Sequence, residues 1–314
     1  MCCRSYHYWL CFTSIAVITA PAQSLQRFEG TEPHMGTLVR ITIYAEKETA
    51  AKQALTQAFA RIHQLDTILS DYNPRSEVSR LSSRPMPISP DLATVLRHAI
   101  EMAKRTRGAF DVTAAPLTHL WRNARKINHL PEETELRQAA AHTGYRHLKL
   151  RRNQAWFTQP HMRLDLGGIA KGYAADQALL TLTNNGIPSA LVAVSGDIAI
   201  GRPPPGRQGW RVTLEPGPGL TRTLELANCG VSTSGDREQY MEVNGVRYSH
   251  IIDPRTGYAL TRPASASVIA PSAIQADAIA TSVCVLGHAR PFQRTPGVTI
   301  LTGANIVTGA NIVR

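Results

Sequence analysis

Residues 164–176, LDLGGIAKGYAAD, constrain the fold more than any other segment. Residues 161–166 form an apolar, strand-like run, two glycines follow, and a helix-forming run then begins with Lys171 in its first turn and Asp176 further along. Adjacent glycines let a ligand approach the main chain because no Cβ is in the way. A helix start presents unpaired N–H groups and a partial positive charge. The segment is typical of a phosphate-binding corner, with a simple chain turn as the alternative.

The composition is that of a globular protein with an excess of positive charge. The 314 residues are 43% hydrophobic, which is ample for a core, and no inert linker divides the chain. The net charge of +11 favours anionic partners. The basic residues are scattered and 6% of residues are aromatic, whereas nucleic-acid binders show a basic stripe with stacking aromatics. We expect one catalytic domain and no nucleic-acid partner; a generally basic soluble protein is the simpler interpretation of the charge.

Residues 1–22 have the pattern of a signal peptide. A basic residue precedes an apolar stretch over residues 8–20, and Ala20-Pro21-Ala22 offers small residues at a cleavage site. The apolar stretch is short for a membrane-spanning helix, which needs about 20 residues. We predict export and a mature domain over residues 23–314, with an uncleaved anchor as the alternative.

Hydrophobic periodicity predicts a mixture of strands and helices. Strands are expected over residues 37–44, 190–194, 210–214, 222–226, 239–243, 246–250 and 265–270, and helices over residues 49–69, 91–107, 131–143, 169–184 and 274–286. Asn244-Gly245 predicts a hairpin turn. Because the elements show no regular βαβ alternation, the expected fold class is α+β. Cys229 and Cys284 lie in apolar runs and are expected to be small buried residues, with one disulfide as the alternative.

Asp277 and Thr281 lie four positions apart in the last predicted helix and therefore project from one face. A carboxylate and a hydroxyl are hard oxygen donors. They suit Mg²⁺, which takes one or two carboxylates and completes its shell with water and phosphate oxygens. The alternative is an aspartate that bonds locally and a threonine that packs against an apolar neighbour.

Residues 230–257 combine a hydroxyl-rich segment at 232–236, expected to be a turn, with the sequence HIIDPRTG at 250–257. His250 is a candidate general base because its pKa falls near neutrality. A histidine at a strand end that is purely structural is the alternative. Tyr72, in a predicted turn, has a ring suited to stacking on a flat cofactor or to covering apolar surface.

These segments, taken in their order along the chain, resemble the ApbE family of FAD:protein FMN transferases. Together with Met35-Gly36-Thr37, the matching motifs are LDLGGIAKGYAAD, TSGD at 233–236, HIIDPRTG and ADAIATS at 276–282, and the resemblance runs from about Met35 to Gly287. It implies an α+β catalytic domain of the ApbE-like kind, exported to the periplasm. Members of the family bind FAD, cleave its pyrophosphate with Mg²⁺, and attach FMN through a phosphoester to a threonine or serine of a partner protein, releasing AMP.

The resemblance also implies roles for individual residues. FAD would contact Met35, Tyr72, Ala109, Phe110, Asp111, Asp165, Lys171 and Ile252, and Mg²⁺ would be held by the side chains of Asp277 and Thr281 and the main-chain carbonyl of Gly168. His250 is the candidate base for the acceptor hydroxyl, with Asp253 expected to orient it. The acceptor would be a subunit of a membrane-bound redox complex. No cysteine follows a lipobox-like triplet, so a soluble periplasmic enzyme is expected, with association with the inner membrane as the alternative.

Two other functions fit almost the same residues. A Mg²⁺-dependent FAD pyrophosphatase would use water in place of the acceptor hydroxyl and give free FMN and AMP. A periplasmic flavin-binding protein would hold the nucleotide without chemistry. Acceptor-dependent release of AMP distinguishes the transferase from both.

Overall fold

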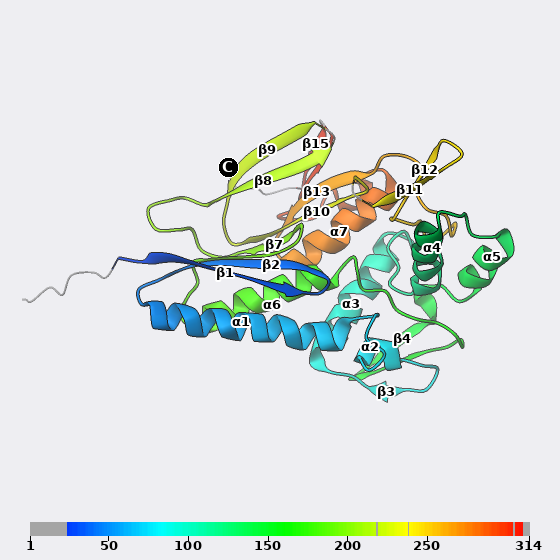
Figure 1. Ribbon diagram of the computed structural model, residues 1–314, viewed down its shortest axis with the longest axis horizontal. Helices are drawn as coiled ribbons and strands as arrows, with labels where there is room; N and C mark the ends of the chain where they lie inside the picture. The colour runs from blue at the N-terminus through cyan, green and yellow to red at the C-terminus, as the bar shows by residue number, and fades with distance from the viewer. Residues whose placement is uncertain (1–23, 218, 238, 304, 310–314) are drawn as a thin grey trace, which may run out of the picture.

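The computed structural model describes residues 24–217, 219–237, 239–303 and 305–309. Within these residues, eight strands form one antiparallel sheet in the order β1-β2-β6-β7-β10-β13-β14-β15 (Figure 1). The strands of this sheet are β1 (Gln26–His34), β2 (Thr37–Ala45), β6 (Ala190–Val194), β7 (Asp197–Ile200), β10 (Cys229–Gly235), β13 (Ser265–Ala270), β14 (Thr299–Thr302) and β15 (Asn305–Thr308). The mixture of helices with antiparallel sheets confirms the predicted α+β class.

Helices cover one face of the sheet (Figure 1). The helices are α1 (Glu48–Leu69), α2 (Glu77–Arg80), α3 (Pro90–Arg105), α4 (Ala115–Ile127), α5 (Glu133–Ala141), α6 (Ala170–Asn184) and α7 (Ala273–Leu286), with 3₁₀ turns η1 (Tyr145–His147) and η2 (Arg290–Phe292). Small residues such as Ala51, Ala54 and Ala58 on α1 let that helix pack closely on α6 and on strands β1 and β2. Helix α7 packs on β10 and β13, and the contact between α6 and α7 lies beneath the predicted phosphate corner.

A hairpin of β8 (Trp210–Gly217) and β9 (Leu220–Leu226) covers part of the opposite face. Alternate residues of β8, Trp210, Val212 and Leu214, are buried against Val231 of β10 and Leu301 of β14. This alternation is the period-2 pattern of a half-buried strand. The sheet is therefore covered on both faces.

Two smaller sheets lie at the periphery. Strands β3 (Met86–Pro87), β4 (Leu148–Arg151) and β5 (Gln154–Phe157) form one, and the hairpin of β11 (Tyr240–Val243) and β12 (Val246–Ser249) forms the other. Asn244 and Gly245 both have positive φ angles, of 52° and 72°, which confirms the predicted hairpin turn. The ring of Trp121 on α4 stacks on Tyr248 of β12, so the hairpin is packed against α4.

Three local predictions were wrong. Residues 161–166 alternate in burial, but none of them belongs to a strand: His161 lies in a turn with a positive φ of 62°, and the N–H of Asp165 donates to Val112 O in a loop. Residues 232–236, expected to be a turn, lie mostly within β10, because Ser232 and Thr233 bond inside the structure. Helix α5 begins at Glu133 rather than at the predicted proline, since Glu132 caps it. The sequence patterns also missed β1, β7, α4 and the strands after Gly297.

Cys229 and Cys284 are free thiols. Cys284 is buried as expected, whereas Cys229 is only half-buried. The predicted signal peptide at residues 1–22 lies outside the described residues. None of the helices described is both long and apolar enough to cross a membrane.

Candidate functional site

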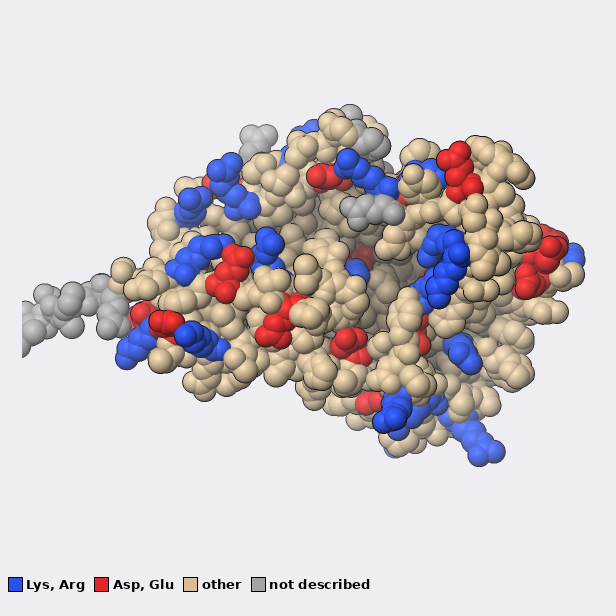
Figure 2. Space-filling view, viewed as in Figure 1, with Lys and Arg blue, Asp and Glu red and all other residues tan. Residues whose placement is uncertain are grey.

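A cavity of about 1630 Å³ lies above the junction of α6 and α7 and beside β10. Figure 2 shows it as a hollow in the middle of one face, with basic and acidic side chains around it. Its lining includes twelve of the thirteen expected site residues: Met35, Tyr72, Ala109, Phe110, Asp111, Asp165, Gly168, Lys171, His250, Ile252, Asp277 and Thr281. Asp253 is absent from the lining.

The glycine corner, residues 165–168, is shaped by Asp165 and by close contact with α7. Asp165 Oδ1 accepts the N–H of Gly167 at 2.8 Å, which fixes the turn just before α6. A Cβ at Gly168 would lie 2.9 Å from Thr281 Oγ1 and 3.3 Å from the Phe110 ring. A glycine is therefore required for the main chain at 168 to lie beside Thr281, as a shared metal site needs.

Helix α7 is held in place by side chains and backbone of α6. Asp176 accepts the N–H groups of Ala273 and Ile274 at 2.8 and 2.9 Å, so a residue from another helix caps the start of α7. Burial raises the pKa of Asp176 to about 6. Asp277 Oδ2 accepts the N–H of Gly172 at 3.0 Å. These bonds fix the Asp277 carboxylate relative to Lys171.

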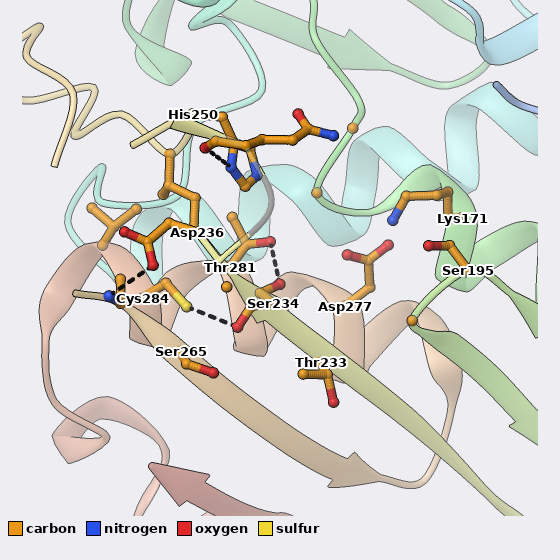
Figure 3. A pocket seen from close by; sticks show the side chains of 18 of the residues that line it. Lys171, Ser195, Thr233, Ser234, Asp236, His250, Ser265, Asp277, Thr281 and Cys284 are labelled. Atoms are coloured by element: carbon orange, nitrogen blue, oxygen red, sulfur yellow. Dashed lines mark hydrogen bonds between the residues drawn. The ribbon is translucent and has the colours of Figure 1, made fainter. Parts of the chain in front are cut away.

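Lys171, whose side chain is half-buried, lies beside two buried carboxyl groups, those of Asp197 and Asp277. Figure 3 shows Lys171 and Asp277 side by side in the cavity. Lys171 Nζ donates to Asp197 Oδ2, and Ser232 Oγ donates to Asp197 Oδ1 at 2.6 Å. Burial opposes the charge on Lys171, but Asp197 and Asp277 outweigh it and raise the pKa of the lysine. Burial and the nearby Asp197 raise the pKa of Asp277, against the opposing influence of Lys171. One ammonium thus faces two carboxyl groups, and the raised pKa of Asp277 shows that this carboxyl favours an additional positive charge, a proton or a cation, beside it.

The tautomer of His250 is set by its backbone neighbour. His250 Nδ1 lies 3.1 Å from Gln239 O, and a carbonyl oxygen only accepts, so in the neutral ring Nδ1 carries the proton and Nε2 is the basic nitrogen. Burial is the main cause that lowers the pKa of His250, and repulsion from Arg125 and Lys171 adds to it. A neutral histidine that lines the cavity with Nε2 unprotonated is suited to general-base chemistry.

The expectation that Asp253 orients His250 is wrong. The Asp253 carboxylate accepts the backbone N–H and the guanidinium of Arg255, two residues along its own turn, with the Arg255 Nε at 2.9 Å. The orienting group of His250 is Gln239 O, which faces it across the β11–β12 hairpin. A local Asx turn satisfied the aspartate, and this outcome is common for Asp before Pro.

A second cluster lies on the side of Tyr72. Arg122 of α4 donates to Asp71 Oδ2 at 2.8 Å and to Asp165 Oδ2 at 2.7 Å. Its guanidinium carbon lies 4.9 Å from the centre of the Tyr72 ring, and the residue Tyr72 is 75% exposed. Met35, in the β1–β2 turn, lines the same cavity and donates its N–H to Asp66. An exposed ring at the edge of a cavity is a suitable platform for a planar ligand.

Asp111 lines the cavity, but its carboxylate is satisfied inside the protein. Oδ1 accepts the N–H and hydroxyl of Thr113, and Oδ2 accepts the N–H of Tyr145 at 2.7 Å. Burial raises the pKa of Asp111. Asp111 therefore shapes the loop that presents Ala109 and Phe110.

Sequence reasoning missed Asp197, Arg122 and Gly172. Asp197 follows a glycine at the start of an unpredicted strand, and Arg122 lies on an unpredicted helix, so neither had a motif of its own. Gly172 lies inside the quoted motif, and a glycine within a helical pattern was its signal: a Cβ there would lie 2.3 Å from Ala273 O.

Comparisons with known proteins agree with this arrangement. A family model described as the ApbE family matches residues 35–296. The chain is 31% identical over 295 residues to the FAD:protein FMN transferase of Vibrio cholerae, covering 90% of this chain and 88% of that protein. It is 32% identical over 284 residues to the protein of the same name from Salmonella typhimurium, covering 86% and 81%.

Solved structures show the same fold. The flavin transferase ApbE from Vibrio cholerae superposes with a TM-score of 0.79 at 30% identity, covering 88% of this chain and 93% of that chain. The apo form of the flavinyl transferase ApbE from Pseudomonas stutzeri gives a TM-score of 0.78 at 29% identity, covering 90% and 92%. The family model matches most of this chain, and relatives that are more than 30% identical cover nearly all of it. The chain therefore belongs to the ApbE family.

Proposed function

We propose that this chain is a Mg²⁺-dependent FAD:protein FMN transferase. It would cleave FAD at the pyrophosphate, attach FMN through a phosphoester to a threonine or serine of a partner protein, and release AMP. The observation that carries the proposal is the cluster in which the buried carboxyl groups of Asp277 and Asp197 meet Lys171 at the glycine corner. The names of the relatives supply the flavin and the protein acceptor.

The cluster fits a divalent cation. Asp277 is 2% exposed, and its carboxylate shares the cavity with the Thr281 hydroxyl and the main chain of Gly168. Among the described residues no group of three or more His, Cys, Asp or Glu side chains is placed to hold a metal ion together, whereas zinc sites in proteins use three or four such ligands. One carboxylate with neutral oxygens is the donor set typical of Mg²⁺ bound together with phosphates. Such a cation would supply the additional positive charge that the Asp277 carboxyl favours.

When bound there, Mg²⁺ would polarise the phosphoanhydride and offset charge on the AMP leaving group. Lys171 would offset the charge of the diphosphate. His250 Nε2 would take the proton of the acceptor hydroxyl while the hydroxyl oxygen forms a bond to the FMN phosphorus. At the same time the bond between that phosphorus and the bridging oxygen of AMP would break. The proton of the hydroxyl thus ends on His250, and AMP leaves with the bond electrons. Bases in such positions contribute about 10²–10⁴-fold in rate.

The location and the acceptor belong to the same proposal. The predicted signal peptide supports action in the periplasm on a subunit of a membrane-bound redox complex, with the enzyme soluble or associated with the inner membrane. A cavity that opens on the surface is compatible with an acceptor segment that enters from outside.

The test incubates the purified chain with FAD and Mg²⁺, with and without a flavin-accepting domain, and measures AMP and covalent flavin. AMP released only with acceptor, together with fluorescent acceptor protein, supports the transferase. AMP released equally in its absence would indicate a pyrophosphatase. FAD that binds but stays intact in both samples would indicate a binding protein.

A further inference from the structure

Arg122 joins three segments of the cavity wall that are distant in sequence. It extends from α4 and pairs with Asp71, which lies in the loop that follows α1, and with Asp165 of the glycine corner. The side chains of Arg122, Asp71 and Asp165 are 24%, 12% and 11% exposed, so these pairs are largely shielded from water. Shielded, charge-assisted pairs to two carboxylates restrict the guanidinium to one geometry.

Each of the two aspartates that Arg122 pairs with, Asp71 and Asp165, is next to a group that lines the cavity. On one side, Asp71 is followed by Tyr72, whose exposed ring lies beneath the guanidinium in a segment without helix or strand. On the other side, the second oxygen of Asp165 accepts the N–H of Gly167 and shapes the corner beside Gly168. Arg122 therefore sets the spacing between a planar platform and the phosphate corner.

A further contact strengthens the pairing of Arg122 with Asp71. His119, one turn before Arg122 on α4, places Nε2 3.1 Å from the same oxygen of Asp71. Burial opposes the charge on Asp71, but hydrogen bonds from His119 and Arg122 outweigh it and lower the pKa of the aspartate. The aspartate is thus ionised at neutral pH and keeps the Tyr72 segment attached to α4.

We propose that Arg122 is a positioning residue for the flavin end of FAD, which rests on the function proposed above. It acts through Tyr72 and Asp165: it presents the tyrosine ring at one distance and orientation relative to the glycine corner, so that flavin and diphosphate are bound together. Losing this preorganisation weakens FAD binding more than it slows the chemical step, because Arg122 lies on the flavin side of the cavity and His250 performs the proton transfer.

The test compares Arg122→Met and Arg122→Lys with Arg61→Met in the full chain. Arg61 is the matched control, since it forms a similar part-buried pair with Asp91 and neither residue lines the cavity. FAD is titrated in Mg²⁺ buffer, and the fluorescence of bound flavin, which a stacked tyrosine quenches, is recorded with the dissociation constant. AMP release with acceptor gives KM and kcat.

For Arg122→Met we expect the dissociation constant and KM for FAD to rise about tenfold, with brighter bound flavin and kcat changed by less than about threefold. Arg122→Lys should recover part of the affinity, because an ammonium can still pair with one carboxylate. Arg61→Met should alter thermal stability without altering either flavin readout. Unchanged affinity and fluorescence in Arg122→Met would overturn the proposal.

If Arg122→Met folds poorly, a double-mutant cycle of Arg122→Lys and Tyr72→Ala provides the test instead. Both variants should fold, because Tyr72 is exposed and lysine keeps the positive charge of Arg122. If Arg122 acts through the ring, the effects of Arg122→Lys and Tyr72→Ala on FAD affinity should be clearly less than additive. Full additivity would contradict the proposal. Failure of the unmodified chain to bind FAD or release AMP would instead refute the proposed function.

Discussion

Asp277 accepts a hydrogen bond from the backbone N–H of Gly172 at 3.0 Å, so the proposed metal ligand is bonded directly to the helix that carries Lys171. The contact depends on glycine, because a Cβ at 172 would lie 2.3 Å from Ala273 O and 2.9 Å from Asp277 Cβ. The α6–α7 interface is thus both a packing contact and the base of the site. Mutations at this interface can therefore be compared for their separate effects on the stability of the fold and on the release of AMP.

Gly172→Ala should destabilise the fold and disrupt the site together. The added methyl group meets backbone atoms that cannot move without shifting α7, and overpacking of this kind costs about 1–3 kcal/mol. We expect a lower midpoint of urea unfolding and a large loss of AMP release. Gly206→Ala is the control for a loss of stability away from the site: an added Cβ meets no atom within 4 Å, but the positive φ of Gly206 is strained for alanine, so this variant should lose stability and keep AMP release. Equal stability and equal activity in Gly172→Ala and the parent would show that the interface tolerates the methyl group.

Asp277→Asn should separate stability from activity. The amide is isosteric and can still accept the N–H of Gly172, while the buried negative charge beside Asp197 disappears. We expect a melting temperature equal to or above that of the parent, because active-site charges are often held at a cost in stability. Mg²⁺-dependent AMP release should fall at least about a hundredfold, as expected when a metal loses its charged ligand.

Chelation provides the parallel measurement for Asp277→Asn. EDTA should reduce the parent to the rate of the variant, and added Mg²⁺ should restore the parent alone. A variant that keeps the parent's response to Mg²⁺ would place the cation elsewhere.

Asp176→Ala should loosen α7 and weaken the metal site from a distance. Removing an N-cap acceptor costs about 0.5–2 kcal/mol, and here one carboxylate serves two N–H groups. We expect lower thermal stability and a severalfold higher Mg²⁺ concentration for half-maximal activity. Ser89→Ala is the matched control: Ser89 Oγ caps α3 through the N–H of Leu92, and Ser89 does not line the cavity. It should lose stability without a change in Mg²⁺ requirement.

The contrast between predicted and observed elements has a physical cause. Strand β2 was predictable because Val39, Ile41 and Ile43 alternate with the polar residues Arg40 and Thr42. Helix α7 was predictable because it is an apolar run between Pro271 and Gly287. Residues 161–166 show the same alternating burial without a partner strand, since side-chain alternation reports burial and not backbone pairing. Strand β10 was missed because its buried hydroxyls find partners on neighbouring strands, which composition cannot reveal.

The site divides in the same way. Asp277, Thr281 and Lys171 lie in local motifs whose spacing carries chemical meaning, and all three line the cavity. Asp197 and Arg122 act through partners 26 to 51 residues away in sequence, so their roles arise only when the chain is folded. The error on Asp253 has the same origin, because proximity in sequence to His250 did not place its carboxylate on the imidazole.

The pH dependence of transfer should report the depressed pKa of His250. Burial disfavours the imidazolium, and Arg125 adds repulsion, so the pKa lies below the ordinary value of 6.5 while Gln239 O and Asp236 oppose part of the shift. A general base acts in its neutral form, so activity should persist as pH falls through 6.5 and decline only at lower pH. Arg125→Gln removes a repulsive charge and should therefore move the acid limb of kcat to higher pH.

His250→Ala should remove the acid limb of kcat and reduce kcat by about 10²–10⁴-fold while FAD affinity changes little. An acid limb that is identical in the parent, Arg125→Gln and His250→Ala would assign the titration, and the proton transfer, to another group.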